Sequence, residues 1–153
     1  EDTGPRSTVD CDQALSTEAP ATCESSVLHC GDVLHATTEG GRSDYSDLFY
    51  ESAYCFVPYE SYGSPERVYE LHLEDQQQID VVLASPCWDM ALAVARWEDT
   101  QTCPPEQDHQ ILECEGFEAG PGGRVTLSSP GGGRYLVIVE GPPANFELRI
   151  ECP

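Results

Sequence analysis

The sequence contains no lysine: its seven basic residues are all arginine, against 28 acidic ones, and the formal net charge is −21. A surface with this balance repels nucleic-acid phosphates and anionic lipids, so we expect neither as a partner. No apolar run approaches the roughly 20 residues of a membrane-spanning helix. Apolar runs such as Tyr135–Val139 have the length of a strand.

The sequence motifs of the common catalytic sites are lacking as well. The chain has no G-x-S-x-G, no H-E-x-x-H, no P-loop and no G-x-G-x-x-G. Four scattered histidines form no pair with the spacing of metal ligands: His29, His35, His72 and His109. Paired carboxylates are expected everywhere in so acidic a chain, so they do not indicate a glycosidase. We therefore predict a protein that is not an enzyme, with a small secreted hydrolase as a remote alternative.

C-x-x-C pairs are absent too, although the chain has eight cysteines. They are Cys11, Cys23, Cys30, Cys55, Cys87, Cys103, Cys114 and Cys152. An even number spread along the chain indicates a disulfide framework, and hence a secreted or cell-surface protein whose export signal was removed before Glu1. Cys103 and Cys114 flank ten residues that begin with a Pro-Pro turn, which predicts a local pair. For Cys11, a bond to Cys23 and a bond to a neighbouring subunit are both open.

With 153 residues, of which 39% are apolar, the chain has the size of one domain with a core. Residues 1–22 are polar and show no sustained period, so we predict an extended N-terminal arm or linker there, followed by one domain at 23–153. Arg67–Leu73 alternates with period two, as a half-buried strand does. Met90–Ala95 alternates large apolar residues with alanine, which favours a strand buried on both faces over a helix.

Glycine- and proline-rich turns separate these and further short runs, and the last run is Phe146–Glu151. Many short strands with such turns between them predict an all-β fold, either a sandwich or a barrel.

Several segments, in this order, carry a family resemblance. They are Cys23–Gly31 with Val33–Leu34, Ala36–Gly41 ahead of Asp44–Ser46, Ser64–Glu70, Ser85–Leu92 and Gly133–Gly141. Together they make the region from Cys23 to Cys152 resemble the bacterial pre-peptidase C-terminal (PPC) domain, in the cysteine-rich form found in large secreted proteins. The resemblance implies a jelly-roll-like antiparallel β-sandwich without an active site, which aids secretion, adhesion or targeting beside another secreted module.

Calcium is the cofactor that the charge and the resemblance suggest, because Ca²⁺ takes six to eight oxygen ligands, many of them carboxylates. Relatives that bind collagen hold calcium through acidic residues near the N-terminal linker. We name Asp44, Asp47 and Asp89 as candidate metal ligands. A departure from the family lies after Cys114, where Glu115–Glu118 stands in place of the family's acidic Asn-Asp-Asp. A solubilising surface of solvated acids is the alternative.

The segment from Ser43 to Tyr62 holds seven of the thirteen aromatic residues. They are Tyr45, Phe49, Tyr50, Tyr54, Phe56, Tyr59 and Tyr62. Tyrosine-rich segments are typical of recognition surfaces, so we predict a binding surface here. A long crossover loop that packs its rings over the open side of the sandwich is the alternative.

The sequence thus predicts a non-catalytic extracellular binding or adhesion module of a bacterium, supported by calcium. Its partner would be an extracellular protein or a glycan polymer. The alternative is a structural subunit, assembled with copies of itself into a filament or surface coat through residues 1–22 and Cys11.

Overall fold

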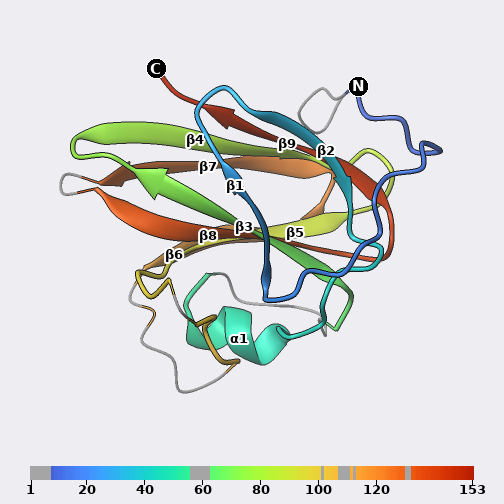
Figure 1. Cartoon of the computed structure of the whole chain (residues 1–153), viewed down its shortest axis with the longest axis horizontal. Helices are drawn as coiled ribbons and strands as arrows, with labels where there is room; N and C mark the ends of the chain where they lie inside the picture. The colour runs from blue at the N-terminus through green and yellow to red at the C-terminus, as the bar shows by residue number, and fades with distance from the viewer. Residues whose placement is uncertain (1–7, 56–62, 101, 107–110, 112, 130–131) are drawn as a thin grey trace.

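The structure of the chain is a computed structural model that describes residues 8–55, 63–100, 102–106, 111, 113–129 and 132–153. Its strands lie in two sheets packed face to face (Figure 1). The first sheet has the order β1 (Glu24–Leu28), β3 (Glu66–Leu73), β8 (Gly133–Glu140), β5 (Met90–Arg96), β6 (Cys114–Gly120). The second has the order β2 (Val33–Thr37), β9 (Asn145–Glu151), β4 (Gln77–Ala84), β7 (Gly122–Ser129). The predicted all-β sandwich is confirmed.

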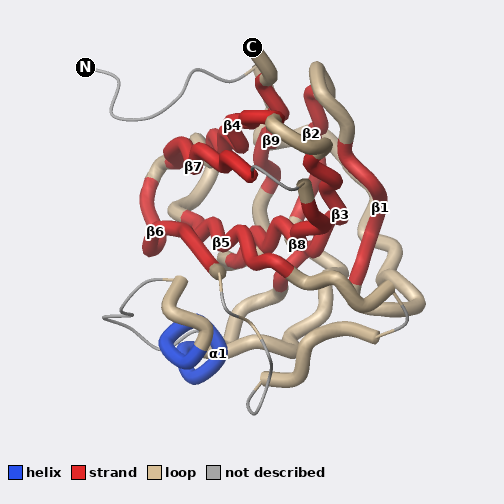
Figure 2. The backbone as a smooth tube through the Cα atoms, turned by 90° about the vertical axis from the view of Figure 1, so that its left-hand side faces the viewer, coloured by secondary structure: helices blue, strands red, loops and turns tan. Residues whose placement is uncertain are grey.

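Neighbouring strands are antiparallel except for β1, which runs parallel to β3. The two sheets meet differently at their two sides, as the end-on view in Figure 2 shows. At one side β6 continues into β7 through Pro121. Gly122 makes this corner feasible, because a Cβ there would lie 2.2 Å from the Leu83 carbonyl oxygen. At the other side β1 and β2 are joined by the turn at residues 29–32.

The main core lies between the sheets, where strands of period two turn their apolar faces inward. Tyr69, Leu71 and Leu73 share that face as predicted, and all three are buried. β5 contributes Met90, Leu92 and Val94 to the same core. Its alanines point to the opposite face of the first sheet, where a second apolar cluster lies. The prediction of a strand buried on both faces is therefore confirmed.

That second cluster exists because a helical segment covers the outer face of the first sheet (Figure 1). Its helix, α1 (Asp47–Ser52), begins at Ser46, whose side chain accepts a hydrogen bond from the Leu48 backbone N–H. Phe49 and Tyr50 are its buried residues. Among the described residues, no helix has the length and hydropathy needed to span a membrane.

All eight cysteines form disulfides, which indicates an extracellular or periplasmic protein. The bonds are Cys11–Cys87, Cys23–Cys103, Cys30–Cys152 and Cys55–Cys114. The predicted Cys103–Cys114 pair is wrong. Cys103 and Cys114 instead tie the loop between β5 and β6, and the start of β6, to distant parts of the chain. Each bond holds an irregular segment or a strand end, so their pairing follows tertiary position rather than sequence spacing.

The N-terminal arm is covalently attached to the sandwich. Cys11 bonds to Cys87 in the turn between β4 and β5, so its predicted bond to Cys23 or to a neighbour is wrong. The Asn145 side-chain amide donates to the carbonyl oxygens of Asp10 and Gln13, at 2.9 Å each. Residues 8–22 contain no helix or strand, yet they are held against their own domain.

Candidate functional site

The predicted aromatic surface is largely internal. Tyr45, Phe49 and Tyr50 are at most 2% exposed, so that part of the binding-surface prediction is wrong. The Tyr45 and Phe49 rings stack with centroids 4.1 Å apart over the first sheet, as in the alternative of a covering loop. Tyr54 is 86% exposed and stays available to a partner. Phe56, Tyr59 and Tyr62 lie outside the described residues.

The buried tyrosines bring two carboxyl groups into the same cluster. Glu66 and Glu140 are direct cross-strand partners on β3 and β8, and each is 1% exposed. Glu66 accepts hydrogen bonds from the backbone N–H groups of Asp44 and Tyr45, and Tyr50 donates its hydroxyl hydrogen to Glu140. Burial raises the pKa of both carboxyl groups to about 8. At neutral pH both are therefore mainly protonated.

The three candidate metal ligands do not share a site. Asp44 is paired with Arg42, Asp47 opens α1, and Asp89 lies in the exposed turn before β5. Across the described residues there is no group of three His, Cys, Asp or Glu side chains that could hold a metal ion. Calcium binding therefore stays a prediction from the overall charge.

A groove with a volume of about 410 Å³ lies between the edge strands β1 and β2. Ser25 and Ser26 of β1 form one wall, and residues 34–37 of β2 form the other. Tyr69 and Arg67 of β3 line it from the first sheet, and residues 16–21 of the arm close one end. We call this feature the β1–β2 groove. Sequence patterns do not reveal this groove, because it depends on how far two edge strands diverge.

Arg67 holds the arm at the end of the β1–β2 groove. Its guanidinium is buried and donates to four carbonyl oxygens, those of Thr37, Glu18, Ser16 and Glu39, at 2.7–3.4 Å. A planar fork of five N–H donors is suited to such a gathering of acceptors. Gly40 allows the arm to approach, since a Cβ there would lie 1.8 Å from the Thr17 carbonyl oxygen. The arm is thus fixed in place by these hydrogen bonds and forms one end of the groove.

The electrostatic field around the molecule is negative because 28 acidic residues outnumber seven arginines, and the described arginines are themselves engaged with partners. The ion pairs are Arg42 with Asp44, Arg96 with Glu98 and Glu113, Arg124 with Asp80 and Glu151, Arg134 with Glu24 and Glu70, and Arg149 with Glu147 and Glu151. Arg67 instead donates hydrogen bonds to backbone carbonyl oxygens. Bonding to Arg134 lowers the pKa of Glu70 to about 2, which keeps that carboxylate ionised.

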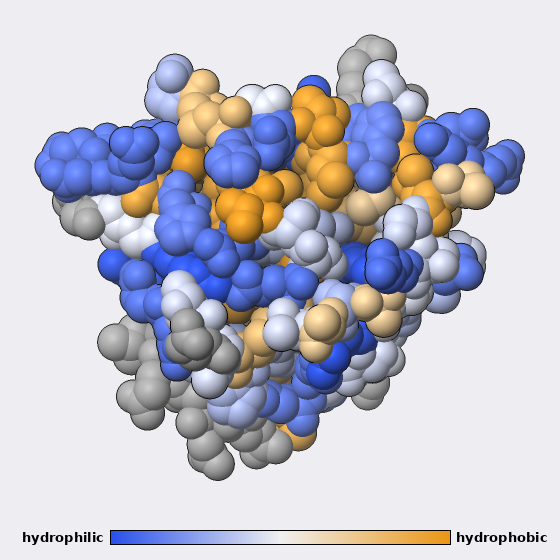
Figure 3. Space-filling model, viewed as in Figure 1, coloured by the Kyte–Doolittle hydropathy of each residue, from blue (hydrophilic) through white to orange (hydrophobic). Residues whose placement is uncertain are grey.

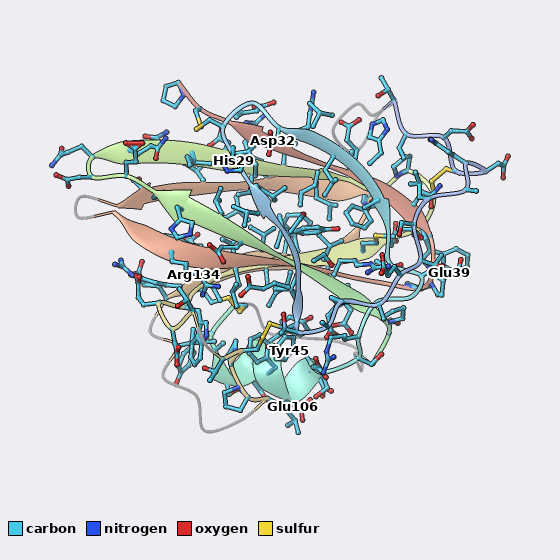
Figure 4. All side chains as sticks on the ribbon, viewed as in Figure 1. His29, Asp32, Glu39, Tyr45, Glu106 and Arg134 are labelled. Atoms are coloured by element: carbon cyan, nitrogen blue, oxygen red, sulfur yellow. A yellow bond between two sulfur atoms is a disulfide. The ribbon has the colours of Figure 1, made fainter. Side chains whose placement is uncertain are left out.

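Acidic residues border the β1–β2 groove on several sides. Glu18 of the arm and Glu24 of β1 line it. Asp32 precedes β2 in the turn that joins the two sheets, and Glu39 follows β2 at the arm end (Figure 4). The basic groups nearby are engaged: Arg134 with Glu24, and His35 with Glu147 at 2.9 Å. Because Glu24 is paired with Arg134, the negative charge presented at the groove comes from Glu18 and Glu39.

Comparison with known proteins bears on the fold. No protein-family model matches the chain, and no curated protein matches its sequence. Among solved structures, the pre-peptidase C-terminal domain of a collagenase from Bacillus anthracis is similar, with a TM-score of 0.51 and 13% identity over 84% of this chain and 96% of that domain. A periplasmic inhibitor of g-type lysozyme from Aeromonas hydrophila has a TM-score of 0.46 and 11% identity, covering 87% of this chain and 100% of the inhibitor. The predicted resemblance to the PPC domain is confirmed for the fold.

Proposed function

We propose that the chain is a non-catalytic binding domain of the extracellular space or periplasm, and that it recognises a cationic partner. The observation that carries this proposal is the distribution of charge. With 28 acidic residues, seven arginines, and every described arginine already in an ion pair or bonded to backbone carbonyls, the surface offers negative charge. Such a field accelerates the encounter with a cationic partner and repels anionic ones.

The absence of catalysis is part of the same proposal. The two carboxyl groups with raised pKa, Glu66 and Glu140, are the kind of pair that general acid–base catalysis uses. They are 1% exposed and sealed by Tyr45 and Tyr50, so a substrate cannot reach them. Their arrangement supports a structural role under the helical segment.

Self-assembly through the arm receives less support. From residue 8 onward the arm is bonded to its own sandwich through Cys11–Cys87 and through Asn145. Residues 1–22 also carry five acidic residues and one arginine, so they would be repelled by the acidic surface of another copy.

The test is binding to immobilised poly-L-lysine and poly-L-glutamate across a range of sodium chloride concentrations. We expect binding to poly-L-lysine that weakens with salt, and none to poly-L-glutamate. The double variant Glu18→Gln/Glu39→Gln, beside the β1–β2 groove, should weaken binding several-fold. The matched variant Glu74→Gln/Asp75→Asn removes the same charge in the exposed turn between β3 and β4 and should have little effect. Equal binding to both polymers, or equal effects of the two variants, would contradict the proposal.

A further inference from the structure

The free edge of β1 offers unpaired backbone groups beside the groove. β1 lies at the end of its sheet, and β3 is its neighbour on the other side. Within the described part of the chain, the backbone of residues 25–28 has no hydrogen-bond partner on the edge that faces away from β3. Such an edge is a template on which another extended chain can pair.

The usual protections of an edge strand are sparse on β1. Residues 24–28 include no lysine or proline, and the bulge lies at the Glu24–Ser26 end. Beyond the bulge, Val27 is 45% exposed, and Val33 at the start of β2 is 60% exposed. Figure 3 shows apolar residues on this face of the molecule between hydrophilic ridges. Exposed apolar residues beside an open strand edge are typical of an interaction surface.

The β1–β2 groove has room and suitable walls for such a chain. Its volume of about 410 Å³ falls in the range of binding sites for ligands. Leu34 and Ala36 of β2 and Tyr69 of β3 supply apolar contacts. An extended chain turns alternate side chains to opposite sides. Small apolar side chains would therefore meet these residues while the alternate positions face solvent and the acidic borders.

Charge selects the kind of occupant. Glu18 lines the groove and Glu39 follows β2 at its arm end (Figure 4), whereas Glu24 is paired with Arg134. We propose that an extended polypeptide segment of a partner, with lysine or arginine alternating with small apolar residues, adds as a strand to the free edge of β1 in this groove. The inference rests on the proposed function and names the partner chemistry and the mode of binding.

The test uses the full oxidised chain and a labelled peptide in which lysine alternates with threonine and valine, followed by fluorescence anisotropy at about 150 mM salt. The same peptide with N-methyl groups on its backbone amides keeps the charge but cannot donate to a strand edge. We expect its affinity to be at least about tenfold lower. Ser26→Trp, which fills the groove, should weaken binding of the first peptide to a similar extent.

The control variant is Ser128→Trp, the same substitution at an exposed serine of the edge strand β7 on the opposite side of the sandwich. It should leave the affinity within about twofold. Equal binding of the two peptides would overturn strand addition while leaving recognition of a cationic partner intact. Failure of both peptides together with poly-L-lysine would remove the proposed function as well. Multimers of the unliganded protein that Ser26→Trp abolishes would instead identify a second copy as the occupant and overturn the proposal.

Discussion

Glu66 and Glu140 occupy facing positions on β3 and β8, closed off from solvent by the helical segment. Two adjacent buried carboxylates would repel each other and would lose their hydration. Protonation relieves both costs, and the Tyr50 hydroxyl adds a hydrogen bond to Glu140. At the scale of single residues, the helical segment is therefore held to the sheet by groups that need to stay neutral.

This arrangement predicts a stability that falls as pH rises. The ordinary pKa of these carboxyl groups is 4.5, and burial raises it to about 8 in the folded chain. Their contribution is fully present below pH 4.5 and is lost as pH rises through 8, at up to about 1.4 kcal/mol per pH unit for each group. Glu140→Gln, which cannot ionise, should flatten the dependence between about pH 5 and pH 8. Urea unfolding at several pH values measures it.

The control for this prediction is Glu74→Gln, at an exposed position in the turn between β3 and β4. It should leave the slope of stability against pH as in the parent chain. A Glu140→Gln protein with the parent's slope would show that Glu140 does not titrate in this range.

Among the elements, the strands could be predicted from the sequence, but the segments that cover them and the strands that lie next to them could not. Alternation in Arg67–Leu73 and Met90–Ala95 reports the faces of a strand directly, because the side-chain period of two is a local property. The tyrosines before and within α1 were misassigned to a surface, because composition alone does not reveal which face of a sheet a segment will cover. The β1–β2 groove and the Glu66–Glu140 pair likewise depend on strand order. Arg67 lies in a strand that also contains Glu66, Glu70 and His72, so its role in holding the arm was not evident from the sequence.

The arm gives a prediction at this scale. Gly40 and Gly31 have nearly the same backbone conformation, with φ of +84° and +86°. Alanine at either position is strained by about 1 kcal/mol. At Gly40 the new Cβ would also meet the Thr17 carbonyl oxygen at 1.8 Å, whereas nothing lies within 4 Å at Gly31. Gly40→Ala should therefore displace residues 16–21 and expose them to protease, and Gly31→Ala should not.

Limited proteolysis followed by reduction and mass spectrometry reads out that difference, since Cys11–Cys87 retains a cut arm until it is reduced. Arms that are cleaved at the same rate in both variants would show that the Gly40 contact does not hold the arm in place.

The whole molecule is held by a core between two sheets and by disulfides that span most of the chain. The sequence separations of the four bonds are 76, 80, 122 and 59 residues. Cross-links over long separations restrict the unfolded chain strongly in the chain-entropy description. They also offset the self-repulsion that a net charge of −21 imposes on the folded state.

Removing the longest cross-link tests this view. Cys30→Ser/Cys152→Ser opens a loop of 122 residues and frees the β1–β2 turn from the end of β9. We expect the free energy of unfolding to fall by about 2–5 kcal/mol, with a lower midpoint in urea under non-reducing conditions. The fall should be larger at low salt, where self-repulsion is least screened. An unchanged midpoint would show that the core alone stabilises the fold.

The Cys30–Cys152 bond also decides how the molecule responds to tension. A force applied between Cys11 and Cys152 passes along the backbone to Cys30 and then crosses the disulfide. Another covalent route from Cys11, across the Cys11–Cys87 bond and along the backbone from Cys87 to Cys152, is longer and is slack when the first route is fully extended. The oxidised chain should extend by no more than about 65 Å before it becomes taut, against about 480 Å once reduced. Pulling single molecules with and without reductant would show this short tether, which confines the extension of the oxidised chain to the arm and β1.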